Sequence, residues 1–257
     1  MNYISYSLWG DDKKYFDGLL LCIEKAKLHY PHFTVVVFID KMLKKSWVKK
    51  LTQMRIRVIP KSKEYEWDGL YWRFEVFDLE DCEMAIVRDS DSPSTKRESE
   101  LVYEWINSDK KLHIIRDHPA HDMPIMGGMW GVKGAFPFLV KDCIDKWRWR
   151  SQKGTDQFFL RKFIYLKYWK DALVHSSNNA FSGEYVNWIE PVSNFIGKPN
   201  FCQENYSPSY EKKLHKRPNF LKTLKSEFYL LRNSIRSKKS LNYEPERKIK
   251  TQLPRIK

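Results

Sequence analysis

The 257-residue chain lacks the features that mark several protein classes. No apolar run approaches the roughly 18 residues of a membrane-spanning helix. Residues 1–12 have no basic stretch, so we expect no secretory signal there. The motifs GxGxxG and GxxxxGK[ST] are both missing, which argues against a glycine-rich phosphate loop.

Cysteine is scarce and widely spaced. The four cysteines contain no CxxC pair, so the sequence indicates neither a structural zinc site nor a disulfide framework. We expect free thiols in a reducing compartment and therefore a cytoplasmic protein.

The formal charge of +14 is concentrated at one end of the sequence. Residues 211–257 hold 15 Lys and Arg against 4 Asp and Glu, a net charge of +11. Residues 1–210 have a net charge of only +3. A nucleic-acid-binding protein would more often spread basic residues over its folded surface, so nucleic acid is not the expected partner of this part.

Short apolar segments alternate with segments that have helical periodicity. Residues 33–39 and 84–87 have the pattern of buried strands, and residues 15–30 predict a helix that ends at Pro31. The alternation predicts an α/β domain with a mainly parallel central sheet flanked by helices. Further strands are expected at 2–8, 56–60, 112–115 and 126–132, and further helices at 44–54, 69–79, 97–107, 137–150 and 156–165.

An acidic turn follows the expected strand 84–87. Asp89 and Asp91 are two residues apart, so in an extended segment their carboxylates point the same way. Two hard oxygen ligands suit Mg²⁺ or Mn²⁺, particularly when phosphate oxygens complete the shell. The alternative is a polar loop that contains two aspartates by chance.

Five short motifs occur in a fixed order within residues 88–131, and the resemblance that they carry covers roughly residues 3–180. They are Arg88-Asp89-Ser90-Asp91-Ser92, Arg97-Glu98, Val102 with Trp105, residues 113–121 with His118 and His121, and Gly127-Gly128-Met129-Trp130-Gly131. Together they resemble a family of small GT-A-type glycosyltransferases found in bacteria and in chloroviruses. One departure is Pro93, where the family usually has arginine.

The resemblance implies a GT-A fold over residues 1–195 and a metal-dependent transfer of sugar to an acceptor hydroxyl. The donor would be a nucleotide sugar, with a UDP-sugar favoured because UDP is the commonest partner in this fold. The acceptor would be a glycan or a lipid-linked sugar. The residues expected to bind the donor are Ser5, Tyr6, Ser7, Arg73, Arg88, Asp89, Gly127, Gly128, Met129, Trp130 and Gln157.

The expected metal ligands are Asp89, Asp91 and His175, because a late histidine completes the shell in many GT-A enzymes. A structural histidine is the alternative for His175. Asp156 is the first candidate for the base that an inverting enzyme needs, and Asp117 is the second. Helix capping is the alternative role for Asp156, and a structural ion pair is the alternative for Asp117.

Other roles remain open for the glycines and for the acidic turn. Residues 127–131 could equally form a bulged strand with Trp130 in the core. The acidic turn would also suit the active site of a metal-dependent phosphatase or nuclease. The basic residues 211–257 would suit a nucleic-acid-binding protein.

We expect residues 196–257 to form a C-terminal extension. Residues 219–236 predict a basic amphipathic helix, which suits either the anionic surface of a membrane, on its cytoplasmic face, or docking on the catalytic domain. Residues 241–257 are expected to be disordered.

Overall fold

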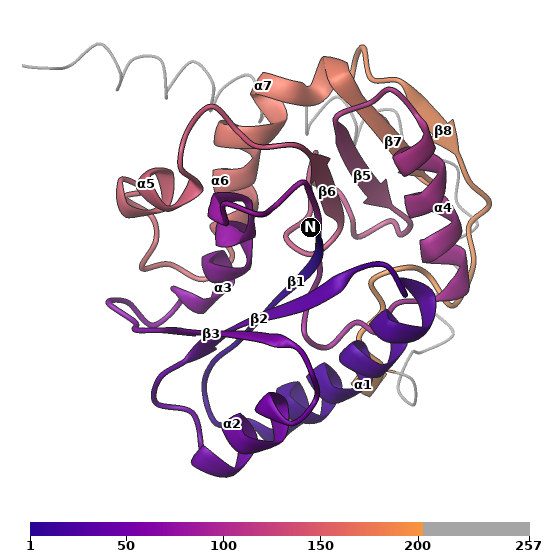
Figure 1. Ribbon diagram of the computed structural model, residues 1–257. Coiled ribbons are helices and arrows are strands. Elements are labelled where there is room, and N and C mark those ends of the chain that lie inside the picture. Colours follow the sequence, from indigo (N-terminus) through magenta and orange to yellow (C-terminus); the bar gives the residue numbers. More distant parts are fainter. Residues whose placement is uncertain (203–257) are drawn as a thin grey trace, which may run out of the picture. The chain divides into compact units, whose positions relative to one another are not determined.

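The computed structural model describes residues 1–202, which contain one eight-stranded sheet (Figure 1). The strand order is β3-β2-β1-β4-β6-β5-β7-β8, and every pair is parallel except those that β6 makes with β4 and β5. The strands are β1 (Asn2–Leu8), β2 (Thr34–Asp40), β3 (Arg57–Lys61), β4 (Met84–Val87), β5 (Leu112–Arg116), β6 (Trp130–Lys133), β7 (Ala172–Ser176) and β8 (Val186–Trp188). The predicted α/β class with a mainly parallel sheet is confirmed.

Helices cover both faces of the sheet, and each face has its own hydrophobic core (Figure 1). On one face lie α1 (Lys13–His29), α2 (Lys45–Thr52) and α4 (Lys96–Asn107). On the other lie α3 (Gly69–Trp72) with the 3₁₀ helix Arg73–Asp78 that continues it, α5 (Val140–Asp145), α6 (Asp156–Leu160) and α7 (Leu166–Tyr168). We call these the α1 face and the α3 face.

The alternation of side chains along each strand decides which core a residue enters. In β1, Tyr3 packs in the core of the α3 face, whereas Ile4 and Tyr6 pack in the core of the α1 face. In β4, Val87 belongs to the α3 face and Ile86 to the α1 face. The same alternation sorts the polar residues that follow each strand.

Three elements differ from the sequence prediction. The predicted strand 126–132 begins only at Trp130, because Gly127 and Gly128 form a turn. The predicted helix 137–150 is reduced to α5, and residues 146–155 form a loop. Strand β8 was not predicted, since its three residues carry little periodicity.

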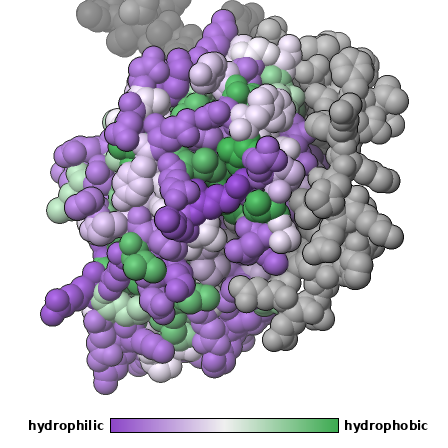
Figure 2. All heavy atoms as spheres, turned by 90° about the vertical axis from the view of Figure 1, so that its right-hand side faces the viewer, coloured by the Kyte–Doolittle hydropathy of each residue, from purple (hydrophilic) through white to green (hydrophobic). Residues whose placement is uncertain are grey.

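The surface on the side of α4 and β8 is mainly hydrophilic, with hydrophobic residues interspersed (Figure 2). No helix within residues 1–202 is long and apolar enough to cross a bilayer. The predicted helix 219–236 lies outside the described residues, and the domain boundary at residue 195 stays a prediction.

A buried ion pair joins β4 to α4. Arg88 Nε donates to Glu98 Oε1 at 2.7 Å, and both side chains are 2% exposed. The Tyr30 hydroxyl donates to the same oxygen at 2.8 Å, and Arg88 also donates to the carbonyl oxygens of Val87 and Trp130. The pair therefore fixes the end of β4, where the acidic turn begins.

We predict that Glu98→Gln lowers the free energy of unfolding by about 3–5 kcal/mol, because it leaves the buried Arg88 without an anion. Urea denaturation of the two proteins measures the difference. Glu100→Gln is the matched control, since Glu100 lies two residues further along α4 with its side chain 63% exposed. Similar unfolding free energies for both variants would contradict the structural role of the pair.

Candidate active site

The acidic turn lies at the carboxyl end of β4, beside the beginning of β6. Because β6 is antiparallel to β4, its first residues meet the end of β4. A Cβ added to Gly128 would fall 2.1 Å from Asp89 Oδ2, and one added to Gly127 would fall 2.4 Å from Asp156 Oδ2. The two glycines are therefore required here because any side chain would displace the carboxylates.

Arg73 connects two of these carboxylates. Its guanidinium donates to Asp89 Oδ1 through Nη1, and to Asp156 Oδ2 through Nη2 at 3.4 Å. Arg73 is only 4% exposed and the Asp156 side chain only 6%, so their contact is shielded from water, whereas the Asp89 side chain is 41% exposed. Asp89 and Asp156, which are 67 positions apart in the sequence, thus meet at one guanidinium.

Two serines of β1 hold the backbone of Arg73. Ser7 Oγ accepts from Arg73 N at 2.9 Å, and Ser5 Oγ donates to Arg73 O at 2.7 Å. Ser5 and Ser7 share one face of β1 because they are two residues apart. These hydrogen bonds position Arg73, so the two serines belong to the site through the arginine that they hold.

The site carries more negative than positive charge. Burial and the nearby Asp89 together raise the pKa of Asp91 to about 6. Burial also raises the pKa of Asp156, although Arg73 opposes this shift. Arg73 thus contacts two carboxylates, and a third, Asp91, lies close enough to interact with Asp89.

The donor set fits a divalent cation in part. Asp89 and Asp91 offer the hard oxygen ligands that Mg²⁺ and Mn²⁺ prefer, and their mutual repulsion is what a cation would relieve. Residues 1–202 contain no group of three or more His, Cys, Asp or Glu side chains that could hold a metal. The remaining ligands would have to come from phosphate oxygens and water.

His175 does not lie at the acidic turn, which corrects its expected role as third metal ligand. Strand β7 is three strands away from β4, a separation of roughly 14 Å at the usual strand spacing. His175 Nδ1 lies 2.8 Å from His113 Nε2, and His175 Nε2 lies 3.2 Å from Glu104 Oε2. These contacts agree with the alternative stated above, that His175 is a structural histidine.

Three expected donor-binding residues are buried in the cores instead. Tyr6 and Arg88 lie toward the α1 face, the first in its core and the second paired with Glu98. Trp130 is fully buried on the α3 face and packs against Phe77, with ring centroids 5.1 Å apart. For Tyr6 and Arg88 the reason is strand alternation, which sends them to the face opposite Ser7 and Asp89.

Asp117 is occupied by structural contacts. Its carboxylate accepts from Arg97 Nη2 at 3.1 Å and from Ile196 N at 3.0 Å, and its side chain is fully buried. Burial raises its pKa. Asp117 therefore has its acceptor oxygens engaged, and the structural alternative describes it better than a role as base.

Of the two remaining expected donor residues, Met129 is also buried, in the core of the α1 face beside Gly197, and its carbonyl oxygen accepts from Ile115 N at 3.0 Å. Gln157 is half-buried in the first turn of α6, next to Asp156.

The structure adds a segment that the sequence did not indicate. Residues 195–200 run past the acidic turn, where Asn200 N donates to Asp91 O at 2.7 Å and Ser92 Oγ donates to Gly197 O at 3.1 Å. Phe195 stacks on His118 with ring centroids 4.1 Å apart. No motif could have revealed these contacts, because most of them use backbone atoms.

His121 belongs to the same region. Burial, together with the neighbouring His118, lowers its pKa to about 3, although Asp89 opposes the shift. The imidazole is therefore neutral and lies within electrostatic reach of the acidic turn. The structure thus brings His121, in place of His175, toward Asp89.

Comparisons with known proteins give structural likeness only. No protein-family model matches the chain, and no curated protein matches it. Among solved structures it is similar to the mannosyltransferase PcManGT from Pyrobaculum calidifontis in complex with GDP-Man and Mn²⁺. The two sequences are 10% identical, the match covers 66% of this chain and 53% of that chain, and the TM-score is 0.44. It is also similar to residues 1–349 of TarS from S. aureus in complex with UDP, with 15% identity, coverage of 73% and 60%, and a TM-score of 0.46.

A third similar structure is the galactosyltransferase LgtC in complex with donor and acceptor sugar analogues, with 12% identity, coverage of 85% and 84%, and a TM-score of 0.46. The chain spans 53% and 60% of the first two proteins. The likeness concerns the arrangement of strands and helices.

The charge at Asp91 leads to a prediction about pH. A carboxyl whose folded pKa is raised to about 6 destabilises the fold once it is ionised, so its cost is absent near pH 4 and complete above about pH 6. Asp91→Asn should therefore raise the melting temperature at pH 7.5, and the gain should vanish near pH 4. Thermal unfolding at both pH values measures this.

Asp109→Asn is the control, because the Asp109 side chain is 85% exposed and lies on the loop before β5. It should leave the melting temperature unchanged at both pH values. An Asp91→Asn protein that melts at the wild-type temperature at pH 7.5 would contradict the repulsion inferred for the acidic turn.

Proposed function

We propose that the chain is a glycosyltransferase that moves a sugar from a nucleoside-diphosphate sugar to a hydroxyl of a glycan or lipid-linked acceptor. The observation that carries the proposal is the meeting of Arg73, Asp89 and Asp156 beneath the glycine turn, at the carboxyl ends of β1 and β4. Ligands bind at such strand ends in parallel α/β sheets. The order of motifs that resembles GT-A-type glycosyltransferases supports the same function.

The nucleotide is proposed to be UDP because of that resemblance alone. Arg73 is the candidate partner of the diphosphate, since a guanidinium matches phosphate oxygens in charge and geometry. Gly127 and Gly128 let the carboxylates of Asp156 and Asp89 lie directly against the backbone.

Asp89 and Asp91 would hold Mn²⁺ or Mg²⁺. When bound, such a cation would stabilise negative charge on the departing diphosphate. The excess of carboxylates over arginine at the site, and the raised pKa of Asp91, support cation binding. Most of the shell would be supplied by the ligand and water, because Asp89 already accepts from Arg73.

Asp156 is the candidate base. Its side chain is 6% exposed, and burial raises its pKa, which strengthens it as a proton acceptor. Arg73 opposes that shift, because its positive charge favours the ionised carboxylate. In an inverting enzyme Asp156 would take the proton of the acceptor hydroxyl, and in a retaining enzyme it would orient the sugar or the acceptor.

A cytoplasmic location, with the tail touching an anionic membrane surface, completes the proposal. It depends on residues outside the described range and on the net charge of +11 over residues 211–257. A lipid-linked acceptor would be consistent with such a location.

We predict that UDP with Mn²⁺ stabilises the protein. A ligand present at 100 times its dissociation constant adds about 2.7 kcal/mol, or roughly 5–10 °C in melting temperature for a domain of this size. A thermal-shift panel of nucleoside diphosphates and nucleotide sugars, with and without Mn²⁺, measures the effect and identifies the base.

Asp91→Ala should abolish the part of the shift that depends on Mn²⁺, whereas Asp109→Ala should retain it. The proposed function fails if no nucleotide or nucleotide sugar shifts the wild-type protein and none is turned over.

A further inference from the structure

Tyr71 lies at the centre of a buried hydrogen-bond chain between α3 and the loop of residues 146–155. Trp147 Nε1 donates to the Tyr71 hydroxyl at 3.2 Å, and this hydroxyl lies 2.6 Å from Thr155 Oγ1. Thr155 Oγ1 in turn lies 2.7 Å from Trp149 O and 3.0 Å from Gln152 O. Tyr71 is fully buried and its ring packs edge-on against Phe159 of α6.

The chemistry of its ends fixes the direction of this chain. An indole N–H can only donate and a carbonyl oxygen can only accept. The Tyr71 hydroxyl therefore accepts from Trp147 and donates to Thr155, and Thr155 donates to the backbone. Burial raises the pKa of Tyr71 to about 12, so the hydroxyl keeps the proton that it donates.

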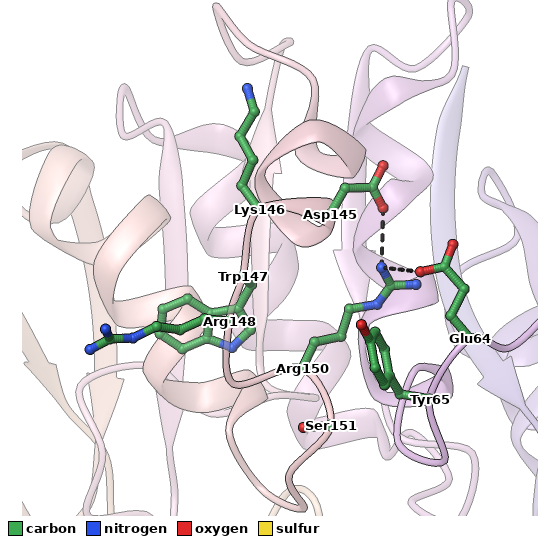
Figure 3. A pocket seen from close by; sticks show the side chains of 8 residues that line it. All are labelled: Glu64, Tyr65, Asp145, Lys146, Trp147, Arg148, Arg150 and Ser151. Carbon is green, nitrogen blue, oxygen red and sulfur yellow. Dashed lines mark hydrogen bonds and ion pairs between the residues drawn. The ribbon is translucent and has the colours of Figure 1, made fainter. Parts of the chain in front are cut away.

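A second contact holds the same loop near α3. Arg150 forms a two-pronged ion pair with Asp68, at 2.5 Å from Nε to Oδ1 and 2.9 Å from Nη2 to Oδ2. Its third nitrogen, Nη1, points toward Glu64 and Asp145 beside a cavity of about 170 Å³ (Figure 3). Because its donors are engaged by three carboxylates, Arg150 serves the loop and has little capacity left for a ligand.

These contacts are made by residues that lie close in the sequence to Arg73 and Asp156, which define the candidate active site. Tyr71 precedes Arg73 by two positions, and Thr155 immediately precedes Asp156. The backbone of Arg73 is held separately by Ser5 and Ser7. The Tyr71 hydroxyl links α3 to Thr155, the residue that comes directly before Asp156 at the start of α6.

We propose that Tyr71 is a positioning residue, whose hydroxyl holds Asp156 at its distance from Arg73. The inference rests on the proposed function of Arg73 and Asp156. Arg73 keeps its own attachment to β1, so loss of the Tyr71 hydroxyl should disturb Asp156 while leaving the nucleotide-binding side of the site in place.

Tyr71→Phe tests this in the full-length protein. We expect kcat to fall by about 10- to 100-fold, the loss typical of a displaced catalytic group, while the KM for the donor changes less than about threefold. Adding Tyr71→Phe to Asp156→Asn should cause little further loss of kcat, because both changes act on the same carboxylate.

Tyr3→Phe is the matched control. Tyr3 is also fully buried and its hydroxyl donates to Asp81 Oδ2 at 2.7 Å, but it lies at the amino end of β1, away from the strand ends that carry the site. It should lower stability without changing kcat. If Tyr71→Phe fails to fold, Trp147→Phe replaces it, since it removes the first donor of the chain and keeps an aromatic ring in the core. Wild-type kinetics in Tyr71→Phe, or a loss of kcat that adds fully to that of Asp156→Asn, would overturn the proposal.

Hydrogen exchange measured by mass spectrometry separates this inference from the proposed function. In Tyr71→Phe the peptides covering residues 155–165 should exchange faster than in wild type, and in Tyr3→Phe they should not. This holds even if the wild-type protein turns over no donor, which would refute only the proposed function. Unchanged exchange over residues 155–165 would overturn the role of Tyr71.

Discussion

The candidate site holds more carboxylates than guanidinium groups, and its organisation depends on this excess of negative charge. Arg73 contacts Asp89 and Asp156, while Asp91 remains close to Asp89 with its pKa raised to about 6. Asp89 and Asp91 are half-buried and repel each other, which disfavours having both ionised. A divalent cation would supply the missing positive charge.

The fold creates this imbalance by bringing together distant parts of the sequence. Parallel strands place the ends of β1 and β4 at one edge, and the antiparallel β6 returns its glycine turn to the same edge. Strand alternation then divides the residues after β4, so that Arg88 stabilises the α1 face while Asp89 reaches Arg73 on the α3 face. The neighbours Arg88 and Asp89 therefore differ in role because they lie on opposite faces of the sheet. Arg88 is structural, and Asp89 lies at the candidate site.

Much of the fold could be predicted from the sequence, because hydrophobic periodicity marks strands and helices locally. The acidic turn could be predicted as well, since charged residues follow a short buried strand. The errors concern tertiary geometry. Nothing in the sequence shows that β5 pairs with β7, and this pairing directs His175 toward His113.

The site residues found only in the structure have a common reason for being missed. The contacts of residues 195–200 with the acidic turn are mostly made by backbone atoms, and the chain through Tyr71 depends on a loop where the pattern predicted a helix. Such contacts leave no signal in residue type or spacing. They become visible only once the elements are placed in space.

Binding of Mn²⁺ to the protein, followed by electron paramagnetic resonance of the free ion, tests the central claim most directly. The excess of carboxylates predicts that the wild-type chain with UDP removes about one equivalent of Mn²⁺ from solution, and that Asp91→Asn removes far less. Equal binding of Mn²⁺ by wild type and Asp91→Asn, or no binding by either, would contradict the account.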